Sequence, residues 1–515
     1  MNVNVVPRSE NCIENMHDEV LVTIFDYLKG NDLKSVMLTC RLFNDIVGLS
    51  SKLMEKLMLK ITSKRNWNLG VLLDCERKYQ HLRIKKFAAS DSYGPVFQCF
   101  LEVVKNVKIF ELHDCHINFN DLQEIIVFLP KMTQFELVNV KIMGDFNILE
   151  DQQLPILNHL KVIKIIDSDL CFEIFEKARN LVGICLQYDD CRRRENINLT
   201  PLEVILCNQK QLKSLEIFNI RYSNLFDRDF VDELPFQLDN LTLSQCYFRN
   251  KDNFDKFVDR QLELQEVELA MGNLNLKLDR LRYFEDFLLH VFRLKKLNHL
   301  NLEIKNYQFM NENHFHHGIS ENLTSLSCSL DQTCKLSSVL KVFPNLKTLE
   351  LKAKHLELQE IDFLNNNLVN LEDLKVVNFS SDVFQQLKFK NLKSISIFET
   401  NIEPKDWDQF IINNPAITKL IINYTFFMDL SEAMIYKLTS KWNLEHFELI
   451  DKYIGLENDI YEMICNNCKN LKYLKLWNVN IEKDFDDADK DYLKSRNIQF
   501  HLFNDETLNT PMVPF

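Results

Sequence analysis

Apolar residues along most of this chain recur in one short pattern. The spacing L-x-x-L-x-L appears almost unchanged at three places, beginning at Leu212, Leu346 and Leu471. With Val, Ile, Met, Phe or once Cys at the apolar positions, fifteen copies begin between Val107 and Leu471, at a mean spacing of 26 residues, and a weaker copy opens at Tyr79. Positions four and six are two residues apart, as on one face of a strand, and the rest of each unit has helical spacing. Each unit therefore predicts one strand and one helix.

This period lies within the range of about 20 to 29 residues that is typical of leucine-rich repeats. A single unit cannot bury its own apolar face, so neighbouring units must stack. The sequence predicts an α/β fold: a leucine-rich-repeat solenoid of about 16 repeats over residues 79–502. Its parallel strands should line the concave face and its helices the convex face. Residues 503–515 are expected to form a C-terminal tail.

A different pattern precedes the repeats. Apolar residues at helical spacing in three consecutive stretches, the first two separated by Gly30 and Asn31-Asp32, predict three short helices over residues 12–52. Residues 53–78 are expected to form a helical linker or N-terminal cap. Three short helices bury too little apolar surface to be robust on their own, which indicates a partner.

Residues 16–47, MHDEVLVTIFDYLKGNDLKSVMLTCRLFNDIV, resemble an F-box. The matching positions follow the F-box order and spacing, while Met16-His17 stand in place of the usual Leu-Pro and Phe43 in place of the usual Trp. The matching residues are Glu19, Val20, Leu21, Ile24, Phe25, Tyr27, Leu28, Asp32, Leu33, Cys40 and Arg41.

An F-box followed by leucine-rich repeats is similar to the substrate receptors of Skp-cullin-F-box ubiquitin ligases. The resemblance implies that the F-box binds a Skp-family adaptor and through it a cullin, that the repeats bind a target protein, and that other subunits transfer ubiquitin. A non-catalytic scaffold that binds the adaptor without target degradation is the alternative, and an enzyme hidden in the solenoid is a third reading that no motif supports. The residues expected to contact the adaptor are Met16, Val20, Leu21, Ile24, Phe25, Leu28, Leu33, Cys40 and Phe43.

Strand alternation assigns the concave surface, because positions three, five and seven point away from the buried positions four and six. Acids at position five are more frequent in the first half of the repeats and predict a target with a basic segment. Apolar side chains at position seven predict an apolar anchor, unless the C-terminal tail covers them or neither reading holds. The candidate target-binding residues are Glu111, Glu136, Glu216, Glu268, Glu350, Phe218, Phe398, Ile450 and Trp477.

The amino-acid composition argues against several classes of function. Only 9 of 515 residues are Gly, which argues against the glycine-rich phosphate turns of nucleotide enzymes. The net charge of -13 disfavours binding to nucleic acid and to anionic membranes. No signal peptide or membrane-length apolar stretch is expected, so the chain is predicted to be cytoplasmic, nuclear or both. The 14 cysteines are scattered among apolar neighbours and are expected to be free thiols.

Four clusters could carry other chemistry, and each has a simpler explanation. Cys465 and Cys468 form a C-x-x-C without a second pair at metal spacing, so a structural role is expected. The histidines at 314–317 lack ligand partners nearby. The acids at 484–491 do not fit a calcium loop and suit a helix start, and the arginines at 192–194 suit an insertion loop or a contact for an acidic partner. The sequence thus predicts no metal site and no cofactor.

Overall fold

The structure is a computed structural model of the whole chain, and it contains two compact units, residues 1–260 and residues 261–515. The residues that it describes are 13, 16–62, 77, 79–87, 105–144, 157–169, 171–188, 199–220, 224–226, 230–246, 248, 250–271, 288–304, 320–330, 336–353, 356–400, 402–424, 432–451, 455–456, 460–477, 480–481 and 487–503.

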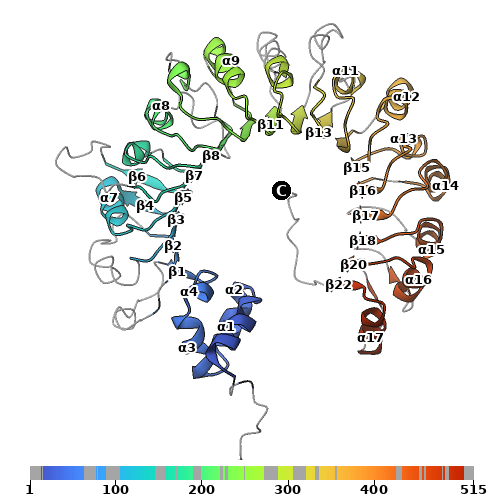
Figure 1. Cartoon of the computed structure of the whole chain (residues 1–515), viewed down its shortest axis with the longest axis horizontal. Helices are drawn as coiled ribbons and strands as arrows, with labels where there is room; N and C mark the ends of the chain where they lie inside the picture. Colours follow the sequence, from blue (N-terminus) through green and yellow to red (C-terminus); the bar gives the residue numbers. More distant parts are fainter. Residues whose placement is uncertain are drawn as a thin grey trace, which may run out of the picture. The chain divides into compact units, whose positions relative to one another are not determined.

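Unit 1 begins with four short helices around a small apolar core (Figure 1). Leu21, Phe25 and Leu33 are at most 3% exposed at its centre, and the rings of Phe25 and Phe43 meet edge to face at 5.1 Å. Leu57, which follows the fourth helix, packs into the same core. The helices are α1 (Asp18–Asp26), α2 (Gly30–Met37), α3 (Arg41–Leu49) and α4 (Ser51–Met54).

A parallel sheet follows in unit 1, with every neighbouring pair aligned position for position. Short helices lie on one side of this sheet (Figure 1): η2 (Phe172–Phe175), η3 (Val231–Glu233), α7 (Phe119–Val127), α8 (Thr200–Cys207) and α9 (Lys251–Arg260). The strands are β1 (Met58–Thr62), β2 (His81–Lys85), β3 (Ile109–His113), β5 (Gln134–Val138), β7 (Val162–Ile166), β8 (Gly183–Gln187), β9 (Ser214–Phe218) and β10 (Asn240–Ser244).

Unit 2 repeats this arrangement. Its strands are β11 (Glu266–Met271), β12 (His299–Ile304), β13 (Ser325–Leu330), β14 (Thr348–Lys352), β15 (Asp373–Val377), β16 (Ser394–Phe398), β17 (Lys419–Tyr424), β18 (His446–Asp451), β20 (Tyr473–Trp477) and β22 (Gln499–Phe503). Its helices are α11 (Leu336–Leu340), α12 (Leu358–Asn367), α13 (Ser381–Phe384), α14 (Pro404–Asn413), α15 (Glu432–Lys441), α16 (Ile460–Asn467) and α17 (Asp487–Ser495).

The predicted repeat register is confirmed. Leu215, Ile217, Leu474 and Leu476, at motif positions four and six, are all at most 1% exposed. Strands β9 and β20 alternate between half-buried and buried residues along their whole length, as a sheet with one covered face requires. The leucine-rich-repeat class of α/β fold therefore holds in both units.

A left-handed residue ends many of the strands. The residue that directly follows β2, β3, β5, β7, β9, β10, β15 or β16 has a φ between 48° and 62°, although none of these residues is glycine. The backbone N–H of Asn139, for example, donates to the carbonyl of Ile166 at the end of the next strand, 2.9 Å away. Asn and Asp tolerate this conformation better than most residues, and they occupy five of the eight positions.

The structure extends the predicted repeats at both ends. Each of the sixteen predicted repeats contains a strand, but β1 lies at residues 58–62, where a helical linker was expected, and β22 follows the last predicted repeat. Motif position one is Lys56 before β1 and Asn497 before β22, so both copies lack the first apolar residue of the pattern. Two further short pairings, β4 (His116–Asn118) with β6 (Lys141–Met143) and β19 (Gly455–Leu456) with β21 (Asn480–Ile481), lie between strands and helices.

Candidate interaction surfaces

Helix α1 has one buried and one exposed apolar face. Leu21 and Phe25 point into the core of the helical domain, whereas Val20, Ile24 and Tyr27 are 46%, 39% and 87% exposed. The exposed residues are spaced four and three apart, so they form a single stripe along the helix. This stripe, with Met16 before the helix at 45% exposure, is called the α1 stripe below.

The predicted adaptor-binding residues thus divide into three groups. Leu21, Phe25, Leu33 and Phe43 form the domain's own core and are not available to a partner in the folded state, because each packs against the other helices. Leu28 and Cys40 are partly buried against that core. Met16, Val20 and Ile24 remain on the surface. Adaptor contact through these three residues remains a prediction.

The helical domain is joined directly to the first repeats. The Gln80 side-chain amide donates to the carbonyl of Ser51 at 3.1 Å, and Lys108 forms an ion pair with Glu55 at 2.9 Å. Arg77 donates to the side-chain oxygen of Asn44 at 2.7 Å. These contacts hold α3, α4 and the segment after α4 against the start of the solenoid.

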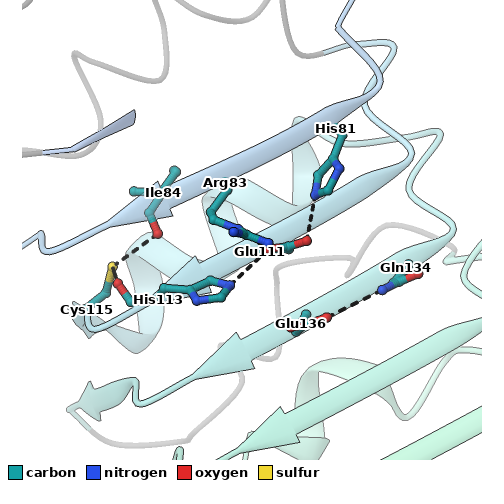
Figure 2. A network of polar contacts seen from close by, with 8 residues as sticks. All are labelled: His81, Arg83, Ile84, Glu111, His113, Cys115, Gln134 and Glu136. Carbon is teal, nitrogen blue, oxygen red and sulfur yellow. Dashed lines mark hydrogen bonds and ion pairs between the residues drawn. The ribbon is translucent and has the colours of Figure 1, made fainter. Parts of the chain in front are cut away.

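Motif positions three, five and seven form one surface of the sheet in each unit, and this surface is called the strand face below. In unit 1, a polar network crosses the strand face. At its centre, Glu111 on β3 accepts hydrogen bonds from His81 Nε2 at 2.6 Å, from His113 Nε2 at 2.9 Å and from Arg83 (Figure 2). Glu111 is only 4% exposed. Glu136 follows Glu111 on the neighbouring strand β5, in direct register.

The Glu111 side chain stays negatively charged although it is buried. Burial alone raises the pKa of its carboxyl group, but the hydrogen bonds from His81 and Arg83 outweigh burial and lower the pKa to about 2. The carboxylate is therefore ionised at neutral pH and already compensated by its neighbours.

Two of the other predicted acidic side chains, Glu350 and Glu216, also have polar partners. Glu350 forms an ion pair with Lys375 at 2.8 Å, and Glu216 accepts a hydrogen bond from Ser214 at 3.2 Å. Glu268 is half-buried on β11. Position five is Lys60 on β1 and Arg83 on β2, so the first strands are basic at this position. These basic residues offset part of the negative charge on this part of the strand face. A target with a basic segment stays a prediction.

In unit 2, the predicted residues Phe398, Ile450 and Trp477 lie in one row, called the apolar row below. The strand register aligns Val377, Phe398, Asn423, Ile450 and Trp477 at position seven of five successive strands, and Asn423 is the one polar residue among these five. All five are half-buried. The ammonium groups of Lys375 and Lys475 lie 4.8 Å and 5.1 Å from the ring centroids of Phe398 and Trp477. Phe218 is half-buried at the same motif position in unit 1.

Of the other clusters named from the sequence, some lie in the part of the chain that the structure describes and some lie outside it. Cys465 and Cys468 are buried free thiols, and burial raises the pKa of each to about 11. Helix α17 begins at Asp487, in agreement with the expected helix start. The histidines at 314–317, the arginines at 192–194 and the tail after residue 503 lie outside the described residues.

Sequence reasoning missed the basic partners of Glu111. His81 and Arg83 belong to the weak repeat at Tyr79, and His113 lies at position seven of its own strand. Aligning positions three, five and seven of the first three strands would have brought these residues together, because parallel strands in register place equal positions side by side.

The chain is similar to one protein family over its N-terminal region and to solved structures over most of its length. Residues 18–59 match the F-box-like family. Similar solved structures include TLR13 in complex with ssRNA13, at 16% identity and a TM-score of 0.43, covering 88% of this chain and 67% of that chain. They also include a leucine-rich-repeat protein of Leptospira interrogans, at 12% identity and a TM-score of 0.32, covering 88% of this chain and 92% of that chain. The sequence matches no curated protein.

Within the described residues, no helix is both long and apolar enough to cross a membrane.

F-box domains generally bind Skp-type adaptors, and here an F-box-like domain is followed by stacked strand-helix units. The chain therefore combines a region that matches the F-box-like family with stacked strand-helix units of the leucine-rich-repeat class.

Proposed function

We propose that this chain is a substrate receptor of a Skp-cullin-F-box ubiquitin ligase. The F-box-like domain binds the Skp-family adaptor and through it a cullin, and the strand face of the repeats binds a target protein. The chain itself carries out no chemistry, and other subunits transfer ubiquitin. The observation that supports this proposal most directly is the α1 stripe on an F-box-like domain.

The α1 stripe is the surface proposed to bind the adaptor. Single exposed apolar residues are common on any protein, but apolar residues spaced to share one helix face form a continuous patch. Val20, Ile24 and Tyr27 meet this condition, and Leu38 after α2 is also 87% exposed. Docking of an apolar surface of the adaptor would remove these side chains from water, at about 25 cal/mol per Å² of apolar area.

The apolar row of unit 2 is the surface proposed to bind the target. Phe398, Ile450 and Trp477 present large apolar side chains, which commonly dominate the energy of protein interfaces. Lys375 and Lys475 lie against two of these rings and leave polar groups at the edge of the row. This pattern of an apolar centre with polar neighbours suits a protein partner.

The F-box-like domain packs against the first repeats of unit 1. The contacts of Ser51, Glu55 and Asn44 with the first repeats make the adaptor-binding domain part of unit 1 rather than a tethered module.

The test replaces the α1 stripe while leaving the domain core intact. Val20→Ser together with Ile24→Ser should weaken binding of a purified Skp-family adaptor by about 30-fold or more, since central interface residues often contribute about 2 kcal/mol or more. Val204→Ser, at a residue that is 42% exposed on α8, is the matched control. Isothermal titration calorimetry measures binding, and circular dichroism checks folding. Unchanged adaptor affinity in the double variant would contradict the proposed surface.

A second measurement separates a receptor from a scaffold. The full chain with its adaptor should retain a cullin in a pulldown, and a protein that binds the chain should gain ubiquitin in a reconstituted ligase reaction. A chain that binds the adaptor but never recruits a cullin would be a scaffold.

A further inference from the structure

The polar network on the strand face of unit 1 brings together three side chains that commonly ligate metals. We propose that Glu111, His113 and Glu136 bind one divalent transition-metal ion, with Zn²⁺ the ion expected to fit best. One ligand atom from each residue lies within 4.8 Å of the others. The proposal concerns unit 1 alone and does not depend on the proposed ligase function.

The sheet fixes the backbones of these three residues. Glu111 and Glu136 are directly paired on β3 and β5, and His113 lies two residues after Glu111, so all three side chains leave the same face of the sheet (Figure 2). Zinc bound at about 2.0 to 2.2 Å from each ligand needs donor atoms roughly 3.3 Å apart. Side-chain rotation can close this distance, because Glu136 and His113 are only half-buried. Coordination through an unprotonated ring nitrogen of His113 then replaces the hydrogen bond that His113 Nε2 donates to Glu111 in the metal-free chain.

Hydrogen bonds from neighbouring side chains already orient both carboxylates, Glu111 and Glu136. His81 Nε2 donates to Glu111 Oε1 at 2.6 Å, and Gln134 Nε2 donates to Glu136 Oε2 at 3.5 Å (Figure 2). Hydrogen bonds of this kind orient metal ligands and tune their affinity. Arg83 contacts Glu111 and Lys164 lies in register beside Glu136, so both cations oppose a metal ion, and binding depends on coordination rather than on a net negative charge of the cluster.

The donor set selects among metal ions. Imidazole nitrogen with carboxylate oxygen suits zinc and its neighbours in the first transition row. Calcium prefers six to eight oxygen ligands, and magnesium prefers an oxygen octahedron that keeps several waters, so neither ion gains from His113. Three protein ligands leave a fourth zinc position open to water or to a side chain of a bound protein.

The experiment uses Zn²⁺ alone as the probe and the untagged full chain, with equilibrium dialysis to measure binding. The wild type should bind one Zn²⁺ in addition to any binding shared by all variants. His113→Ala and Glu136→Gln should each weaken that binding by more than about 100-fold, and His81→Ala by about 10- to 100-fold, as expected for loss of an orienting partner. His299→Ala is the matched control, since His299 lies at position three of β12 and contacts Ser325.

Cobalt substitution identifies the donor atoms independently of affinity. Co²⁺ at this site should give visible bands without the thiolate charge-transfer band that cysteine ligands produce, and the bands should be lost in His113→Ala and Glu136→Gln. Circular dichroism checks that each variant is folded. Two outcomes would overturn the site: no saturable Zn²⁺ binding by the wild type, or equal binding by the wild type and both folded ligand variants. A thiolate band at the saturable site would also overturn it, because the metal would then be bound by cysteines.

Discussion

Glu111 is a buried carboxylate that keeps its charge because three basic side chains meet it. In the unfolded chain its pKa returns to about 4.5, whereas in the folded chain it lies near 2. A folded-state pKa below the unfolded value means that the ionised group stabilises the fold above pH of about 4.5, and that this stabilisation is lost as the pH falls through about 2.

Glu111→Gln should therefore lower the free energy of unfolding by about 1 to 3 kcal/mol at pH 7, and the difference from the wild type should shrink as the pH approaches 2. Urea unfolding of both proteins at pH 7, 4 and 3 measures this difference. The Glu136→Gln variant is the comparison, because Glu136 accepts one long hydrogen bond and should contribute less. A pH-independent difference for Glu111→Gln would contradict the assigned ion pairs.

Burial protects the thiols of Cys465 and Cys468. Because burial raises both pKa values to about 11, almost no thiolate is present at pH 7.5. Iodoacetamide should leave both residues unmodified in the native chain and modify both in guanidinium chloride, as peptide mass spectrometry would show. Rapid modification in the native chain would indicate that this part of α16 opens readily.

At the scale of single elements, helix α2 begins at a position that only glycine fits. A Cβ on Gly30 would lie 2.5 Å from the carbonyl oxygen of Lys56, which follows α4. Backbone atoms cannot move away as easily as a side chain. The start of α2 is therefore set by its contact with a segment 26 residues further along the chain.

Gly30→Ala should destabilise the F-box-like domain by about 1 to 3 kcal/mol, the usual cost of overpacking. Gly48→Ala is the matched control, because its Cβ would meet only the Arg77 side chain at 3.4 Å, and alanine is the better helix former in α3. Hydrogen exchange of the α1 to α3 amides in the full chain measures both effects. Equal protection in the two variants would contradict the close contact between α2 and the segment after α4.

Helix α1 shows why the spacing of apolar residues in the sequence did not identify the exposed face of the helix. Val20, Leu21, Ile24 and Phe25 all suit a helix with an apolar side, and their spacing gives no reason to prefer one pair over the other. Packing against α3 and the segment after α4 buries Leu21 and Phe25. Leu21→Ala with Phe25→Ala would therefore abolish adaptor binding by unfolding the domain, at about 2 to 5 kcal/mol for each residue.

At the scale of the whole molecule, the strand faces of the two units differ in chemistry. Unit 1 carries the charged network around Glu111, and unit 2 carries the apolar row. Long-range charges mainly affect the rate of association and its salt dependence, while apolar anchors mainly affect the lifetime of a complex.

Once a target is identified, Trp477→Ala and Phe398→Ala should each speed its dissociation by about tenfold or more, and Glu216→Lys with Glu268→Lys should change association chiefly at low salt. Stopped-flow kinetics or surface plasmon resonance measures both rates. Ile412→Ala is the control, since Ile412 is 70% exposed on α14, away from the strand face. Unaltered kinetics in all four strand-face substitutions would place the target elsewhere.

The sequence by itself determined the repeat period, the strand register and the F-box-like helices, because each depends on the spacing of apolar residues a few positions apart. Tertiary structure decided the rest. It completed the terminal strands β1 and β22 through pairing with neighbours, although motif position one is polar in both. It chose the buried face of α1 through packing with distant helices. It also turned Glu111 from an expected acidic contact into the centre of an ion-pair network, because side chains in separate repeats, such as His81 and Glu111, become neighbours only when the strands stack.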